Sequence, residues 1–385
     1  MISLRSLRQA VPCYAAIWGS GYLAYETSPL LVGAIVDGLG LNERQAGAVI
    51  TAELLVLAGT TVVLAAWMTR VSIRKLALVG ISIAVAANLL TTTADSYASL
   101  LLFRGLAGFG SAFAVAAGNA TIAGSEDPQK TYAHMLILMG PALLVIMSGV
   151  GFAAEHWGLP GAYAFMALWL ALMLPVLTKL PHAARREERA VAAGPVPWGF
   201  GLVAVAAVGL FTVGDGATWS MSERIGANLQ IDPAAAGRIL GMSALVGGLS
   251  GSVLSTAVGW RIGRAAPLVI WMLLAIAFTQ LLTRTSTELF YVLAAIGYQG
   301  SFYFVTSYFY GNAGDLDPSG RVSVAASGVA MAGGAIGPFL GGHLVLDHGF
   351  PAIANFVVVN AAIVVTLSVV VAREVIRLQA RNPSQ

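Results

Sequence analysis

Four ionisable residues stand inside long apolar segments of this chain: Glu26, Glu53, Arg104 and Asp215. A charged side chain is costly at hydrocarbon depth, so such residues usually face a water-filled cavity or a partner and mark an ion or substrate pathway. A carboxyl group can bind and release a proton, whereas arginine keeps its charge and needs an anionic partner. Their types and positions therefore predict a site that handles protons or a charged solute.

Glu26 is followed by a helix-breaking residue. Pro29 has no N–H, so the carbonyl of Tyr25 loses its helical partner and a kink is expected. The freed carbonyl, the two intervening hydroxyl side chains and the carboxylate would form a polar pocket for a proton or cation. Alternatively, Arg104 neutralises Glu26 permanently, or Glu26 lies exposed at the rim of a cavity.

Asp215 lies between Gly214 and Gly216, which would let a neighbouring backbone approach closely or let the helix bend. We expect Asp215 to lie at a depth similar to that of Glu26, on an equivalent helix. The alternative is that its segment ends early and Asp215 is solvated.

Glu53 and Arg104 each have more than one interpretation. Glu53 is a second titrating group, or a partner of Arg44 or of a tyrosine near the outer mouth. Arg104 is expected to contact Glu26 or Glu53. It would then release a proton from a carboxyl group, bind an anionic substrate, or form a purely structural ion pair.

Aromatic residues gather between positions 291 and 310. Tyr298 and Phe302 are one helical turn apart, as are Gln299 and Tyr303, so one of these faces is expected to line a cavity and stack a planar or apolar substrate. Aromatics near Tyr308 are typical of a membrane-interface belt. The predicted substrate contacts are Tyr22, Tyr25, Trp219, Tyr298, Gln299 and Phe302.

The composition indicates a membrane protein. The chain has 385 residues, of which 57% are hydrophobic and 10% charged, whereas soluble domains carry about a quarter charged residues. The net charge of +3 gives no sign of nucleic-acid binding. Cys13 is the only cysteine, which excludes an intrachain disulfide.

Apolar segments of the length that crosses a bilayer recur along the whole chain. The predicted fold is an all-α polytopic membrane protein whose transmembrane helices form two pseudo-symmetric six-helix bundles, residues 1–180 and 198–385, joined by a charged linker at 181–197. The 12 predicted spans are 11–36, 45–69, 74–94, 97–122, 132–154, 160–180, 198–222, 234–257, 266–284, 288–311, 322–346 and 351–372.

Basic residues predict the orientation. Most Lys and Arg residues fall on the side of the two termini and the linker, whereas Arg44, Arg224, Arg238 and Arg284 fall on the other. Since cytoplasmic loops carry the excess of positive charge, both termini are expected in the cytoplasm, with the chain in the inner membrane.

The two halves match weakly at an offset near 190. Asn42 aligns with Asp232, and both are predicted N-caps of the following helix. At the same offset Asp215 corresponds to Tyr25, next to Glu26. Two parallel repeats of this kind favour a site near the membrane midplane between them.

Three motifs resemble signatures of the major facilitator superfamily. In the segment 66–75, Arg74 and Lys75 fit the first signature, while Arg70 stands where the family has an acid. Residues 104–110 are similar to the fourth-span signature Arg-x-x-x-Gly-x-Gly, which the family links to proton movement. Residues 333–342 resemble the antiporter signature, but lie in the eleventh predicted span rather than the fifth.

The resemblance implies a monomeric secondary transporter similar to the drug/proton antiporter branch. It implies conformational or gating roles for Arg70, Arg74, Lys75, Gly108, Gly110, Gly337, Pro338 and Gly341, and the kink expected at Pro29 suggests the same role for that residue. The acids and the aromatic wall favour efflux of a hydrophobic or cationic small molecule by proton antiport. Proton symport of a small organic acid, with Arg104 on the substrate carboxylate, is the alternative.

Other classes lack support in the sequence. No phosphate-binding loop of the form Gly-x-x-x-x-Gly-Lys-Ser/Thr occurs, and no His, Cys or carboxylate spacing suggests a metal site. A membrane enzyme or a receptor would need a catalytic motif or a large extramembrane domain. We therefore expect no enzyme and no cofactor; the expected partners are a small-molecule substrate, protons and the lipid bilayer.

Overall fold

The structure is a computed structural model that describes residues 4–65, 71–125, 128–182, 198–259, 261–317 and 320–381. All regular elements in these ranges are helices. The first group is α1 (Leu4–Ala16), the π-helix η1 (Ile17–Gly21), α2 (Leu23–Glu26), α3 (Ser28–Leu39), α4 (Glu43–Ala65), α5 (Ile73–Thr91), α6 (Tyr97–Ala123) and α7 (Pro128–Leu177). The second group is α8 (Trp198–Ser220), α9 (Ser222–Asn228), α10 (Pro233–Val258), α11 (Ala265–Arg284), α12 (Glu288–Leu316), α13 (Arg321–His348) and α14 (Pro351–Arg381).

The predicted fold class, all-α with twelve membrane-crossing segments, is confirmed, although only 10 helices in the described ranges are long and apolar enough to be candidate spans by themselves. α7 accounts for two predicted spans, because the chain reverses at Gly158, whose φ of 61° and ψ of −151° are not helical. The first span is interrupted, and its longest apolar piece is the short helix α3.

The interruption of the first span lies where proline predicts it. α2 ends at Glu26, Thr27 has a non-helical ψ of 1°, and α3 begins with Ser28 and Pro29. One turn earlier the chain widens into η1, and short π-helical segments of this kind are often found at functional sites. Glu26 is therefore near the end of an irregular region that begins at Ile17.

The predicted N-caps are also confirmed. Asn42 Oδ1 accepts a hydrogen bond from the backbone N–H of Gln45 at 2.9 Å. Asp232 Oδ1 accepts one from the N–H of Ala235 at 2.6 Å. Each bond satisfies a backbone donor at a helix start that would otherwise lack a partner.

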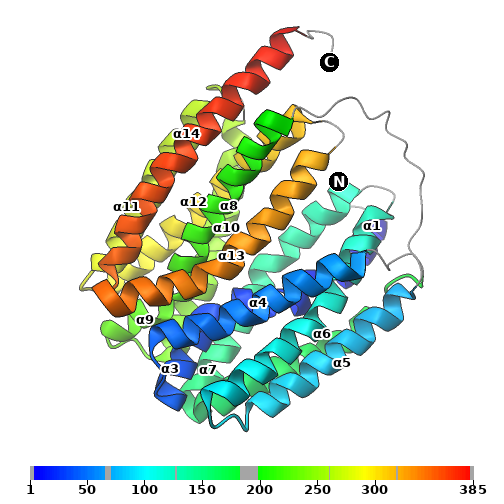
Figure 1. Ribbon diagram of the computed structural model, residues 1–385, viewed down its shortest axis with the longest axis vertical. Coiled ribbons are helices and arrows are strands. Elements are labelled where there is room, and N and C mark those ends of the chain that lie inside the picture. Colours follow the sequence, from blue (N-terminus) through cyan, green and yellow to red (C-terminus); the bar gives the residue numbers. More distant parts are fainter. Residues whose placement is uncertain are drawn as a thin grey trace.

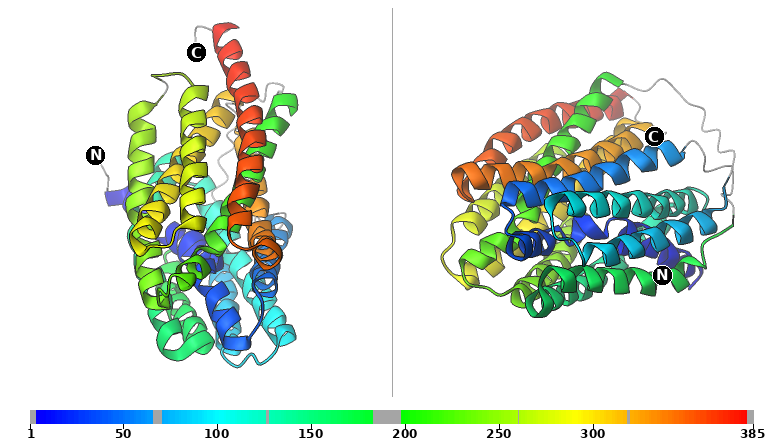
Figure 2. Two further views of the ribbon diagram at one scale, coloured as in Figure 1. Left: turned by 90° about the vertical axis from the view of Figure 1, so that its left-hand side faces the viewer. Right: turned by 60° about the horizontal axis from the view of Figure 1, so that its bottom comes forward.

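The two groups of helices lie side by side (Figure 1). They contact each other mainly through α4 against α13 and α7 against α10. The ends of α1 and α14 nearest the chain termini lie at one end of the bundle, which we call the terminal side; the opposite end is the far side (Figures 1 and 2). Residues 183–197 lie outside the described ranges, so the proposed division into 1–180, 181–197 and 198–385 stays a prediction.

The groups pack tightly at the far side. A Cβ atom added to Gly47 of α4 would overlap the backbone of Pro338, and one added to Gly342 of α13 would overlap the backbone of Glu43. Gly328, about four turns before Gly342 on α13, would meet nothing within 4 Å. Toward the terminal side α4 and α13 diverge (Figure 1), so the two groups are closed at the far side and splayed at the terminal side.

Candidate functional site

Asp215 connects the two groups of helices through both of its carboxylate oxygens. The hydroxyl of Tyr25, on α2 in the first group, donates to Oδ2 at 2.6 Å. The hydroxyl of Tyr298, on α12 in the second group, donates to Oδ1 and lies 3.1 Å from the Asp215 carbonyl oxygen. Asp215 is 9% exposed. One buried carboxylate thus holds a tyrosine from each group.

Glycines on α8 and α13 make this contact possible. A Cβ at Gly216 would overlap the backbone of α13 at Gly334, and one at Gly337 would overlap the backbone of Gly216. The ring of Tyr25 packs against Gly334. The glycine-rich sequence around Asp215 therefore serves close helix packing, which brings Tyr25 within reach of the carboxylate.

Glu26 lies one residue from Tyr25 but makes different contacts. It is 3% exposed, and neither of its carboxylate oxygens has a hydrogen-bond partner among the described residues. Its backbone carbonyl accepts a hydrogen bond from Nε1 of Trp219 at 3.1 Å. Trp219 therefore connects α8 to the end of α2 through a hydrogen bond. The carboxylate of Glu26 remains available for a proton or another ligand.

Arg104 pairs with Glu53 and not with Glu26. Its Nε and Nη2 atoms donate to Glu53 Oε2 at 3.0 Å and Oε1 at 2.7 Å. Nη1 donates to Asn88 at 3.0 Å and Thr91 at 3.4 Å, and the guanidinium lies 4.6 Å from the ring centre of Tyr163. The network lies entirely within the first group, because α4, α5, α6 and α7 supply all of its members. Of the partners expected for Glu53, Arg44 is therefore wrong.

The predicted substrate contacts separate into two sets. Tyr22 lies between the groups, where its hydroxyl contacts the Met331 sulfur at 2.7 Å. Phe302 instead stacks on Phe211 within the second group, with ring centres 5.7 Å apart. The Cβ of Gln299 lies against Gly247 of α10, so its helix face packs on a neighbour.

A small cavity adjoins Asp215 inside the second group. It has a volume of about 30 Å³ and is lined by Tyr298, Phe302 and Thr218, among others. That volume suits one or two water molecules and excludes an organic substrate. Tyr298 and Phe302 therefore border a small, mostly apolar recess beside Asp215.

The residues assigned gating roles by resemblance have mixed positions. Arg74 Nε donates to the carbonyl of Leu180 at 2.8 Å, near the end of α7, and Lys75 is exposed. Arg70 lies outside the described residues. Arg74 thus stabilises a helix end, as expected where the signature lacks its acid.

The small residues of the signatures lie at helix contacts. A Cβ at Gly108 would overlap the backbone of Glu53, and one at Gly110 the backbone of Gly80, both inside the first group. Gly337 and Gly341 pack on the backbone of α8, and Pro338 packs on Gly47 across the groups. The motif at 333–342 therefore forms the contact between α13, α8 and α4.

Sequence reasoning missed Glu223 on α9, which is 2% exposed. The adjacent Arg224 donates from Nη1 to both oxygens of Asp37 on α3, at 3.0 and 3.1 Å. The charge pattern places Arg224 in a loop of the far side, and a loop position gives no reason to expect a buried neighbour. The signal available in the sequence was that Glu223 and Arg224 directly follow an apolar segment, which is compatible with a buried acid at the end of a span.

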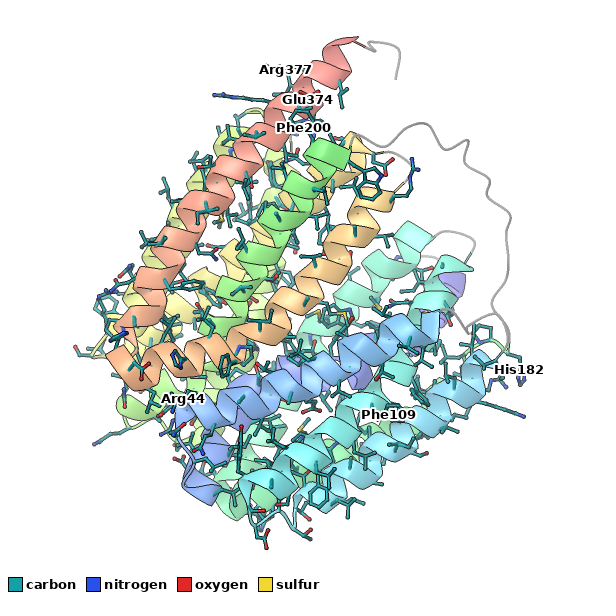
Figure 3. All side chains as sticks on the ribbon, viewed as in Figure 1. Arg44, Phe109, His182, Phe200, Glu374 and Arg377 are labelled. Atoms are coloured by element: carbon teal, nitrogen blue, oxygen red, sulfur yellow. The ribbon has the colours of Figure 1, made fainter. Side chains whose placement is uncertain are left out.

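Figure 3 shows the two ends of the bundle through labelled side chains, with Arg44 at the far side and His182 at the terminal side. Asp215 on α8 lies between these ends, together with Tyr25 and Glu26 on α2 and Tyr298 on α12. No group of three or more His, Cys, Asp or Glu side chains that could hold a metal ion occurs among the described residues.

Several solved structures of transporters have the same fold. A mutant of a nucleoside transporter is 15% identical, with a TM-score of 0.67 over 95% of this chain and 98% of that one. A mutant of a peptide transporter is 12% identical, with a TM-score of 0.73 over 94% and 95%. A bacterial homologue of the human lysosomal transporter Spinster, in an inward-facing conformation, is 13% identical, with a TM-score of 0.69 over 97% of both chains.

At these identities the likeness concerns the fold alone. No curated protein sequence matches the chain significantly. The family model of the major facilitator superfamily matches residues 13–213, more than half of the chain. The chain therefore belongs to the major facilitator superfamily and is a secondary transporter of small molecules, not an enzyme.

Proposed function

We propose that this protein is a proton-coupled transporter that works by alternating access and exports a hydrophobic or cationic small molecule in exchange for protons. One observation carries the proposal. Asp215 accepts hydrogen bonds from Tyr25 of the first group and Tyr298 of the second, so its protonation state bears directly on how the groups are held together.

The coupling follows from hydrogen-bond chemistry. An ionised carboxylate only accepts, and Asp215 can then accept from both tyrosines. When it is protonated, one of its oxygens becomes a donor, and one tyrosine contact is weakened. Proton binding therefore changes the free energy of the contact between Tyr25 and Asp215, and with it the balance between the two orientations of the groups.

Glu26 is the second proton-exchanging group in this proposal. It is buried without a partner for its carboxylate among the described residues, and Trp219 connects its backbone to α8 of the other group. A rocking movement that separates α2 from α8 would expose both acids to water. Tyr22, which contacts Met331 across the groups, would then border the same space.

The state of Arg104 favours export of a cation over symport of an organic acid. Symport requires Arg104 on the substrate carboxylate, yet its guanidinium is 0% exposed and is held by Glu53. Among the described residues, no Lys or Arg side chain is hydrogen-bonded to Asp215 or Glu26. A site with two acids and several aromatic rings suits an apolar cation.

Topology and assembly complete the proposal. Both termini lie in the cytoplasm of a cell whose inner membrane holds the protein, and the splayed terminal side then opens inward. Residues 1–180 and 198–385 are the two bodies that rock, and the protein functions as a monomer. The conformational residues are those at the contact of α13 with α8 and α4.

The test uses purified full-length protein in liposomes with a pH gradient. Ethidium, a planar aromatic cation, serves as the first probe, followed by a panel of organic cations and acids. Glu26→Gln and Asp215→Asn are expected to abolish transport driven by the gradient. Glu288→Gln, at an exposed position on α12, is the matched control and should behave like the wild type. Unchanged pH coupling in both site variants would reject the proposal.

A further inference from the structure

A third buried acid, Glu223, lies at the far side between the two groups. Its Oε2 atom is buried and has no hydrogen-bond partner among the described residues. The carboxylate points at Gly33 of α3, where a Cβ atom would overlap it. Because Gly33 has no side chain, the carboxylate of Glu223 from the second group fits against α3 at this position.

Glu223 borders a cavity of about 130 Å³. The cavity is formed by α3 and α7 of the first group and by α9 and the start of α10 of the second, and most of its wall is apolar, including Leu30, Ala34 and Leu159. Since about 15 Å³ of this kind of volume is enough for one water molecule, this space has room for several waters. The carboxylate thus lies beside a small cavity whose wall is supplied by both groups of helices.

Of the neighbouring charged groups, Asp37 on α3 and Arg224 on α9 form an ion pair with each other through Nη1 of Arg224. The Nε atom of Arg224 is buried and has no hydrogen-bond partner among the described residues. Tyr291 on α12 donates its hydroxyl to the carbonyl of Ser222 at 2.8 Å and not to Glu223.

The acids of α7 and α10 bind the first turn of α10. Glu155 accepts from the N–H of Ala234 at 3.2 Å, and Asp232 accepts from the N–H of Ala235. The backbone N–H of Ala235 lowers the pKa of Asp232, which is therefore ionised at neutral pH. No described side chain thus supplies a hydrogen-bond donor to the Glu223 carboxylate.

A buried carboxylate without a donor is costly when ionised. A metal ion is a poor way to neutralise it, because Na⁺ or Ca²⁺ needs a shell of about six oxygens. Of the side chains lining the cavity, those of Glu223 and Asp37 carry carboxylates, and Asp37 is paired with Arg224. A proton needs no further ligands.

We propose that Glu223 is a further proton-binding site, separate from Asp215 and Glu26, and that protonation of Glu223 accompanies closure of the far side. When the far side closes, the carboxyl group of Glu223 moves from water to the contact with Gly33. In that buried position the protonated, neutral form is more stable than the ionised form. Opening returns Glu223 to water, where it ionises. Lower pH on the far side therefore favours the closed arrangement.

The contribution of Glu223 to the pH dependence is that of a single proton. By linkage, the ratio of closed to open molecules changes by up to about tenfold for each pH unit. The Asp37–Arg224 pair adds little to this dependence, because Asp37 is 60% exposed and such pairs contribute little to stability.

The experiment measures the width of the far side as a function of pH. Spin labels are attached to Arg44→Cys on α4 and Asn228→Cys on α9, positions that lie in different groups. The only native cysteine, Cys13, is 0% exposed and does not compete for the label. The full chain is placed in lipid nanodiscs, and distances are recorded from about pH 5 to about pH 9. This range brackets the protonation of buried carboxyl groups in proteins.

The wild type is expected to show the short distance at low pH and a growing share of longer distances as the pH rises. Glu223→Gln should show a larger share of the short distance at high pH than the wild type does, because glutamine stays neutral. A wild-type pH response in Glu223→Gln would overturn the proposal. So would closure that depends on replacing K⁺ by Na⁺ at fixed pH, which would assign the site to a metal ion.

A second variant tests the geometry. Gly33→Ala places a methyl group where the carboxylate lies and is expected to shift the protein toward the long distance at all pH values. Gly105→Ala on α6 is the control, because a Cβ there meets nothing within 4 Å. An unchanged distance in Gly33→Ala would also contradict the proposal.

The contribution of Glu223 is separated from that of Asp215 and Glu26 in a common background. Because protonation of Asp215 and Glu26 also biases the orientation of the groups, the distances are measured in the double variant Glu26→Gln with Asp215→Asn. The pH response that remains there should disappear when Glu223→Gln is added. Failure of the proposed function would thus appear in the liposome assay of the site variants, and failure of this inference as a pH response that survives Glu223→Gln in this background.

Discussion

Glu53→Gln is expected to destabilise the protein without removing its proton coupling. Glu53 accepts two hydrogen bonds from Arg104, at 2.7 and 3.0 Å, and both side chains are at most 3% exposed. Each hydrogen bond to a charged partner contributes about 1.5–3 kcal/mol. Removing one member of a buried pair costs about 3–5 kcal/mol, since the other charge is left without compensation. After the change Arg104 retains Asn88, Thr91 and the ring of Tyr163.

The free energy of unfolding is measured by SDS titration in mixed micelles, with the liposome assay run on the same preparations. We expect a loss of about 3–5 kcal/mol in Glu53→Gln. The double variant Glu53→Leu with Arg104→Met should regain most of that loss, because buried ion pairs replaced by apolar residues of similar volume are often as stable.

Two results would refute this reasoning. A loss below about 1 kcal/mol in Glu53→Gln would mean that the pair is solvated, since exposed pairs contribute no more than that. Full stability together with lost pH-driven transport would move Glu53 and Arg104 from a structural role to the coupling role that the sequence suggested for them.

Three further predictions concern single contacts. Tyr25→Phe should shift the pH profile of transport more strongly than Phe302→Tyr, because only Tyr25 of these two donates to Asp215; equal shifts in the two pH–rate profiles would count against the coupling scheme. Gly342→Val should hold the far side open, as its side chain would overlap the backbone of α4, and spin-label distances at the far side report this. Asp232→Ala should cost about 1 kcal/mol through the lost N-cap; because the pKa of Asp232 is lowered in the folded protein, its contribution is present above the usual pKa near 3.9 and lost as pH falls further, which unfolding measured at neutral and at strongly acidic pH would show.

Hydrophobicity and helix-end chemistry determined much of the fold from the sequence alone. Long apolar stretches must form helices in a bilayer because their backbone groups have no other partners there, so the span pattern could be read directly. Pro29 predicted the break after Glu26, and Asn42 and Asp232 predicted two helix starts, because these effects act within a few residues of each other. The offset near 190 between the halves even placed Tyr25 and Asp215 at equivalent positions, and these two residues are in contact.

Only the tertiary structure decided which charges meet. Glu26, Glu53 and Asp215 are alike in sequence as acids within apolar segments, yet of these three Arg104 pairs with Glu53. The partner depends on how α4, α5 and α6 rotate about their axes when glycines such as Gly108 let the backbones touch, and rotation is a property of the whole packed bundle. For the same reason Glu223 escaped notice, since its burial comes from Gly33, nearly half the chain away, and no local pattern records a contact between two groups of helices.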